Sequence, residues 1–299
     1  RKLGLPWRVG SYSGLVKHLP HEKTVPGADD EDFSEEILAE IEPITAQVLD
    51  RFSFERGANA GSFMHLVLEL FDFTQAETEL QPAIIKAMQQ YGFDQQLWLA
   101  PLMDWYQEIL ATPLIKPDLS QVCLQQLSPQ HTLVEMEFYL PINQLQAAQL
   151  NSLLGQYGFV NDFSFDTLKG MLKGFIDLTF EHQGQFFIAD YKSNHLGHQL
   201  QDYNQHAMAQ AINSHRYNLQ YILYTLALHR YLRLRMPNYD YNQHIGGCFY
   251  LFLRGMTPDT VGSGVFFDKP DALLIEQLDA LFSQAASDNH AIDVEMEQA

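Results

Sequence analysis

The chain has 299 residues, 46% of them hydrophobic and 18% charged, which is typical of one large globular domain with or without appendages. It contains no run of about 18 apolar residues and does not begin like a signal peptide, so we expect a soluble, cytoplasmic protein. Cys123 and Cys248 are too few for a disulfide framework or a cysteine metal site. The opening RKLGLPWRVG reads like the interior of a polypeptide, so we expect a piece of a longer protein.

The formal net charge of −19 argues against a freestanding nucleic-acid binder, which normally presents a basic surface. Much of this charge is confined to two segments, residues 29–42 with eight acids and residues 288–299 with four. Without these twelve acids the net charge changes from −19 to −7. Such runs ordinarily form a solvated linker or a solvated tail. The alternative is an acidic tether that mimics or repels DNA.

Hydrophobic periodicity predicts alternating helical and extended segments along the chain. A serine-capped helix start is predicted at residues 11–15 and a largely buried helix at residues 63–73. VEMEFYL, at residues 134–140, alternates like a strand, and a hairpin follows at residues 174–194. The other predicted elements are helical pattern at residues 82–108 and 203–235, a buried strand at residues 246–253 and a helix at residues 272–286. This order predicts a mixed α/β fold.

The hairpin GFIDLTFEHQGQFFIADYKSN carries one aspartate in each apolar run. If Gln183 and Gly184 form a two-residue turn, His182 faces Gln185 and the register brings Asp177 opposite Asp190. Directly opposed Cβ atoms lie about 4.5 to 5.5 Å apart. Strand alternation then places Lys192 on the face of Asp190.

Two opposed carboxylates repel unless they share a proton, bind a cation or are fully solvated. A glycosidase-like acid/base pair would fit the spacing, but the lysine two residues later makes it less natural. Two aspartates and a lysine suit a hard cation with an ammonium that stabilises phosphoryl charge. Carboxylates exposed on a solvated sheet face remain the alternative from spacing alone.

These residues resemble the signature of the PD-(D/E)XK nuclease superfamily, with Asp177 as its first acid and Asp190-Tyr191-Lys192 as its (D/E)-x-K. The segments ADYKSNHLG, HRYNLQYILYTLALHRYL and GGCFYLFLRG are similar to the nuclease domains of RecB-type subunits, which belong to the RecBCD helicase-nucleases, or exodeoxyribonucleases V. WRVGSYSGL and MEFYLPI extend the likeness over most of the chain. The resemblance implies a restriction-endonuclease-like PD-(D/E)XK core, in which helices flank a central mixed sheet, and the activity of a metal-dependent deoxyribonuclease.

Site residues follow from the resemblance one position at a time. It implies metal contacts from His65, Asp177, Asp190 and the carbonyl of Tyr191, with Mg²⁺ as the cofactor. Lys192 matches the catalytic lysine, and Gln220 with Tyr224 matches the Gln-x-x-x-Tyr motif. Without the resemblance, His65 would be read as a core histidine and the Gln–Tyr pair as ordinary helix surface. Weaker candidates are Glu135 and Glu137 for the site, and Arg216, Arg230, Arg233, Arg235, Lys169 and Lys173 for phosphate contacts, with a charged helix face as the alternative for the arginines.

The implied partners are single- and double-stranded DNA, a helicase portion of the same longer chain, RecC- and RecD-like subunits, and a RecA-like recombinase. The expected domain organisation is an N-terminal segment with an acidic linker at residues 1–50, a nuclease domain at 51–287 and an acidic tail at 288–299. A noncatalytic docking module that keeps the nuclease fold is the competing hypothesis. The presence of His65, Asp177, Asp190 and Lys192 favours the enzyme.

Overall fold

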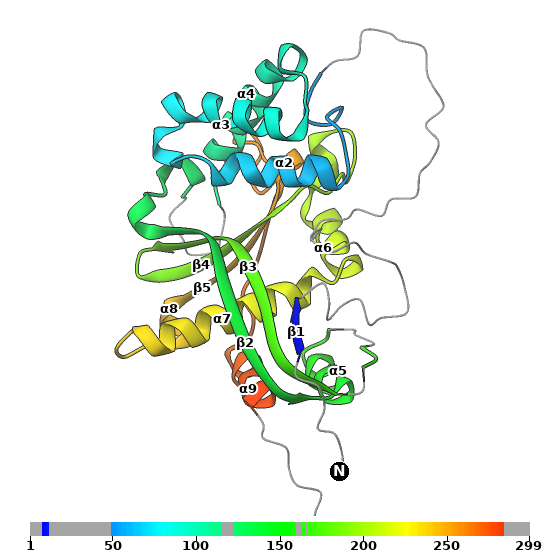
Figure 1. Cartoon of the computed structure of the whole chain (residues 1–299), viewed down its shortest axis with the longest axis vertical. Helices are drawn as coiled ribbons and strands as arrows, with labels where there is room; N and C mark the ends of the chain where they lie inside the picture. The colour runs from blue at the N-terminus through cyan, green and yellow to red at the C-terminus, as the bar shows by residue number, and fades with distance from the viewer. Residues whose placement is uncertain (1–7, 12–48, 115–121, 160–162, 166, 284–299) are drawn as a thin grey trace, which may run out of the picture.

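The computed structural model describes residues 8–11, 49–114, 122–159, 163–165 and 167–283. These residues form a mixed β-sheet with helices packed on both faces (Figure 1). The expected α/β architecture is thereby confirmed. None of the described helices is long and apolar enough to cross a membrane.

The sheet is built around β3, which spans Leu168–His182. Along one side β3 pairs antiparallel with the long strand β2 (Thr132–Leu145). Along its other side it pairs first with β1 (Arg8–Ser11), in parallel, and then with β4 (Gln185–Lys192), antiparallel. Strand β4 continues the sheet in parallel with β5 (Ile245–Phe252), and β5 pairs antiparallel with β6 (Val265–Asp268).

Helices α2 (Ala58–Glu69), α3 (Ala76–Tyr91) and α4 (Gln95–Ala111) cover one face of the sheet (Figure 1). Gly92, at a φ of 78°, ends α3 in the left-handed conformation that glycine adopts without steric cost. Asp94 then caps α4, because its carboxylate accepts from the backbone N–H groups of Gln96 and Leu97. The helices bury a core against the sheet that includes Phe63, Met64, Trp105, Phe180, Phe187 and Phe249.

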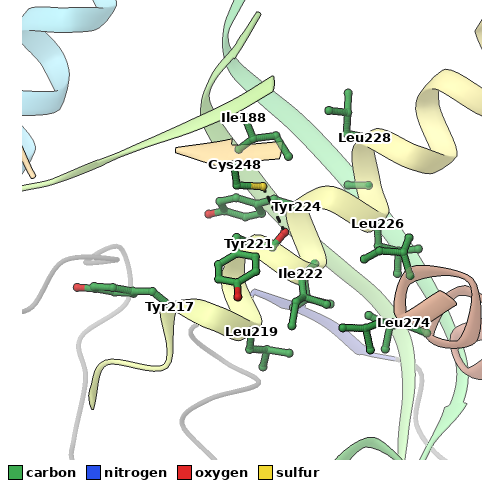
Figure 2. Close-up of a cluster of buried hydrophobic side chains, with 14 of the residues drawn as sticks. Ile188, Tyr217, Leu219, Tyr221, Ile222, Tyr224, Leu226, Leu228, Cys248 and Leu274 are labelled. Carbon is green, nitrogen blue, oxygen red and sulfur yellow. Dashed lines mark hydrogen bonds between the residues drawn. The ribbon is translucent and has the colours of Figure 1, made fainter. Parts of the chain in front are cut away.

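Helix α7 (Tyr217–Arg235) lies on the opposite face, where it packs against the sheet and against α9 (Ala272–Ser283). In Figure 2, Leu219, Ile222 and Leu226 point toward Leu274 of α9, and Cys248 of β5 lies on the opposite side of the helix. Helices buried on nearly all sides carry few charges, and only the last part of α7 is strongly basic. Helices α5 (Ala147–Gln156), α6 (Gln205–Ser214) and α8 (Tyr241–His244) complete the described fold.

Most predicted elements are confirmed, and β2 and β3 extend beyond their expected bounds. The long helical stretch at residues 203–235 is wrong in one respect, because Arg216 adopts a φ of 58° and separates α6 from α7. The helix expected at residues 63–73 ends at Glu69, before a short turn of 3-10 helix. Strand β1 ends at Ser11, where a helix start was expected, and the rest of that prediction lies outside the described residues. Both acidic segments also lie outside them.

Candidate active site

The hairpin register agrees with the prediction. Gln183 and Gly184 form the turn with φ values of 53° and 78°, as a two-residue turn with two left-handed positions requires. The pairs run from His182↔Gln185 to Leu178↔Ala189 and stop there. The next step would join Asp177 to Asp190, but β4 instead continues on β5, where Asp190 pairs with Tyr250. The aspartates therefore lie just beyond the end of this ladder.

Asp177 faces the helical layer that contains α2. Its Oδ2 accepts a hydrogen bond from the backbone N–H of Tyr191 at 2.7 Å and lies 3.6 Å from Nδ1 of His65. The His65 ring also meets the Tyr191 ring edge-on, with centroids 5.7 Å apart. One backbone contact and one imidazole thus fix Asp177 at the point where β3 and β4 cease to pair.

Several acidic side chains lie near the buried side chain of Tyr191. Burial raises the pKa of the Tyr191 hydroxyl well above its usual range, and the charges of Asp177, Glu69, Glu135 and Asp190 raise that pKa further. Glu69 was not predicted, although its position four residues after His65 places both side chains on one face of α2. The i, i+4 spacing between His65 and Glu69 is the feature of the sequence that could have identified Glu69.

Asp190 and Lys192 point away from Tyr191, toward α7, as strand alternation predicts. Nζ of Lys192 lies 2.5 Å from Oδ2 of Asp190, and the two side chains are only 2% and 3% exposed. The ammonium also donates to Oε1 of Gln220 at 3.2 Å. Gln220 in turn donates to the Tyr224 hydroxyl at 2.9 Å, so the Gln-x-x-x-Tyr pair is buried and joined to Lys192. The interpretation as ordinary helix surface is wrong.

Two tyrosine rings lie against the Lys192 ammonium. Nζ is 4.0 Å from the ring centroid of Tyr217 and 5.3 Å from that of Tyr250. The two rings stack with centroids 5.8 Å apart and an interplanar angle of 16°. The Tyr250 hydroxyl donates to the Tyr217 carbonyl and to Oε1 of Gln220, at 2.8 and 3.2 Å. Neither tyrosine was predicted as part of the site.

The two weaker glutamate candidates differ in position. Glu135 adopts a φ of 51° on β2, and its charge helps to raise the pKa of Tyr191. Glu137 instead pairs with Nζ of Lys173 at 2.5 Å and accepts from the Tyr139 hydroxyl at 2.9 Å. The salt bridge with Lys173 and the hydrogen bond from Tyr139 hold the pKa of Glu137 below its usual range. Glu137 therefore belongs to a surface ion pair on the sheet.

Several of the predicted phosphate contacts have structural partners of their own. Arg230 and Arg233 both bind Asp279 of α9, at 2.5 and 2.8 Å. Asp279 thus ties the basic end of α7 to α9. Arg235 lies over the Tyr231 ring, 5.9 Å from its centroid. These contacts favour the charged-helix interpretation for the three arginines.

The donor types in this region suit a divalent cation. His65, the Asp177 and Asp190 carboxylates and the Tyr191 carbonyl offer one nitrogen and several hard oxygens, the oxygens being the ligands that Mg²⁺ prefers. Within the described ranges, no three His, Cys, Asp or Glu side chains form a ready metal-binding group. Asp190 is paired with Lys192 in this structure, so a cation there would share its carboxylate with the ammonium.

Comparison with known proteins decides the family. The model of the PD-(D/E)XK nuclease superfamily matches residues 38–298. The chain belongs to this superfamily. The matched region contains every predicted site residue, and the mixed sheet flanked by helices is consistent with a PD-(D/E)XK fold.

This PD-(D/E)XK chain is also similar to curated RecB subunits of RecBCD enzymes. It is 41% identical over 284 residues to RecB of Escherichia coli K12, which covers 93% of the chain and 23% of that RecB. RecB of Haemophilus influenzae is 39% identical over 231 residues, covering 76% of the chain and 18% of that protein. RecB of Mycobacterium tuberculosis H37Rv is 30% identical over 322 residues, covering 94% and 29%. The chain thus spans less than a third of each of these relatives.

Proposed function

We propose that this chain is the Mg²⁺-dependent DNA nuclease domain of a RecB-type helicase-nuclease. The observation that carries the proposal is that Asp177, with His65 beside it, and the buried Asp190–Lys192 pair both lie where β3 and β4 cease to pair. The family match and the similarity to RecB subunits support the same assignment. The reaction is hydrolysis of a DNA phosphodiester, by exonuclease or endonuclease action, in the bacterial cytoplasm.

The proposed ligands of the ion are His65, Asp177, Asp190 and the Tyr191 carbonyl. When bound, Mg²⁺ would polarise the scissile phosphate and favour deprotonation of a water. The hydrogen bond from Tyr191 N–H holds one oxygen of Asp177 in place.

Lys192 is proposed to stabilise the negative charge that develops on the phosphoryl oxygens, or to orient the attacking water. Its side chain is 2% exposed, so water screens this charge little. Gln220 limits the positions of the ammonium through its side-chain oxygen, and Tyr224 in turn fixes the Gln220 amide. The two motif residues on α7 thereby position the catalytic lysine from outside the hairpin.

We propose DNA, RecC- and RecD-like subunits and a helicase portion of the same longer chain as partners. The relatives are named as RecB subunits of a RecBCD enzyme, and the chain corresponds to a minor part of their length. Delivery by a tethered helicase would explain how a domain with a charge of −19 acts on DNA, because tethering raises the local substrate concentration. A RecA-like recombinase is a further proposed partner.

Incubation of the isolated chain with end-labelled single- and double-stranded DNA tests the proposal. We expect cleavage with millimolar Mg²⁺ and none with chelator. Asp190→Asn is the matched control, because it keeps the side-chain shape and removes the charge that would bind the ion. Absence of metal-dependent cleavage at any protein concentration would favour the alternative, a noncatalytic module that keeps the nuclease fold as a docking surface.

A further inference from the structure

Two tyrosine rings lie against the buried Lys192 ammonium, Tyr217 from the start of α7 and Tyr250 from β5. We call these two residues the aromatic seat. Both are buried, at 7% and 0% exposure, and their rings stack on one another. The exposed His215 stacks in turn on Tyr217, with centroids 5.3 Å apart and an interplanar angle of 18°. The stack therefore runs from the surface to the lysine.

A buried ammonium requires compensation for the water that it has lost. In this structure the nearest compensation is the Asp190 carboxylate, at 2.5 Å. In the proposed function, however, Asp190 would also hold the metal ion, and less of its negative charge would then be available to the lysine. Gln220 and the two ring faces then remain beside the ammonium, and cations are attracted to the faces of aromatic rings within about 6 Å.

We propose that Tyr217 and Tyr250 are positioning residues that hold the Lys192 ammonium at the phosphate when Asp190 is shared with the metal ion. This inference rests on the proposed nuclease function. The tyrosines act through the lysine and do not touch the substrate. Their ring faces are the working groups, while the Tyr250 hydroxyl sets the ring orientation through the Tyr217 carbonyl and Gln220.

The first test is a kinetic double-mutant cycle between Tyr217 and Lys192. Tyr217→Leu removes the ring but keeps an apolar side chain, and we expect kcat to fall about tenfold with little change in KM. Tyr217→Phe keeps the ring and should recover most of the loss. In a Lys192→Met background, Tyr217→Leu should cause no further loss, because the group that it positions is absent. An equal loss in both backgrounds would overturn the positioning role.

Tyr221→Leu is the matched control. Tyr221 is a buried tyrosine on the same helix, but its hydroxyl binds Asp268 and its ring meets the edge of Tyr250. Its replacement should affect cleavage to the same degree whether Lys192 is present or not. Coupling as strong as that of Tyr217 would show a general disturbance of α7 and would count against a specific seat.

A second cycle measures unfolding and does not depend on activity. The four proteins are wild type, Tyr217→Leu, Lys192→Met and the double variant, each unfolded by urea without metal. If the Tyr217 ring stabilises the ammonium, Tyr217→Leu should destabilise the wild type more than it destabilises the Lys192→Met protein. Equal destabilisation of the two proteins would show that the ring and the ammonium do not interact. If the wild type does not cleave DNA, the proposed function fails, and this cycle alone still decides whether the seat binds the ammonium.

Discussion

Nζ of Lys192 lies 2.5 Å from Oδ2 of Asp190, and both side chains are almost completely buried. A buried ion pair costs desolvation for both groups, and removal of one partner leaves the other charge uncompensated. The residue proposed to bind the metal and the residue proposed to act on the phosphate are therefore also each other's neutralising partner in the metal-free protein. This dual role determines how substitutions at either position should behave.

Asp190→Asn should abolish metal-dependent cleavage and also destabilise the metal-free protein, by about 3 to 5 kcal/mol. The facing-carboxylate geometry expected from the hairpin alone would have given the opposite sign, through relief of repulsion with Asp177. The structure reverses that expectation because Asp190 compensates the Lys192 charge. Urea unfolding with chelator measures the effect, and an Asn variant at least as stable as wild type would contradict it.

Lys192→Met should lower the cleavage rate about 10² to 10³-fold, which is the usual effect of removing one group that stabilises charge in the transition state. It should also destabilise the metal-free protein, because the buried Asp190 carboxylate loses its partner. Millimolar Mg²⁺ should restore part of that stability, since the cation takes over the role of the ammonium. Single-turnover cleavage and melting curves with and without Mg²⁺ measure these effects, and near-normal turnover would remove the lysine from the mechanism.

Ca²⁺ should support DNA binding but little cleavage, whereas Mg²⁺ should support both. Ca²⁺ is larger, accepts about 6 to 8 ligands and keeps a more flexible geometry than the octahedral Mg²⁺. Filter binding and gel-based cleavage, with each ion at equal concentration, distinguish the two properties. Equal cleavage rates with both ions would argue against the ligand set proposed for His65, Asp177 and Asp190.

The stability of the protein should fall as the pH decreases from about 6.5 to about 4, in part because of His195. Burial, with the positive charges of Arg56, Arg254 and His198, lowers the pKa of His195 from 6.5 to about 4. The unfolded chain therefore binds a proton at His195 before the folded chain does, so acid favours unfolding in this window. Urea titrations at about pH 7.5 and about pH 5 check this. His195→Gln should lose less stability between them, and an equal loss would exclude His195 as a contributor.

The register of the hairpin was predictable because it depends on short-range chemistry, namely a Gln-Gly turn and the period of two along each strand. The burial of Lys192 was not, because its surroundings come from α7 and β5, which lie 25 to 60 residues further along the chain. The end of pairing after Leu178↔Ala189 likewise depends on β4 staying with β5. Glu69 was not predicted, since the signal for it in the sequence is only its place on the same face of α2 as His65.

The parallel pairing of Arg8–Ser11 with residues 170–173 has a practical consequence for the choice of domain boundaries. A boundary drawn near residue 50, after the acidic segment, would discard β1. Residues 170–173 of β3 would then pair with β2 on one side and with no described strand on the other. The exposed amide and carbonyl groups of Gly170–Lys173 would then be open to pairing with another chain. A fusion protein or a shortened domain should therefore carry the first eleven residues, even though 37 residues outside the described structure separate them from the rest of the fold.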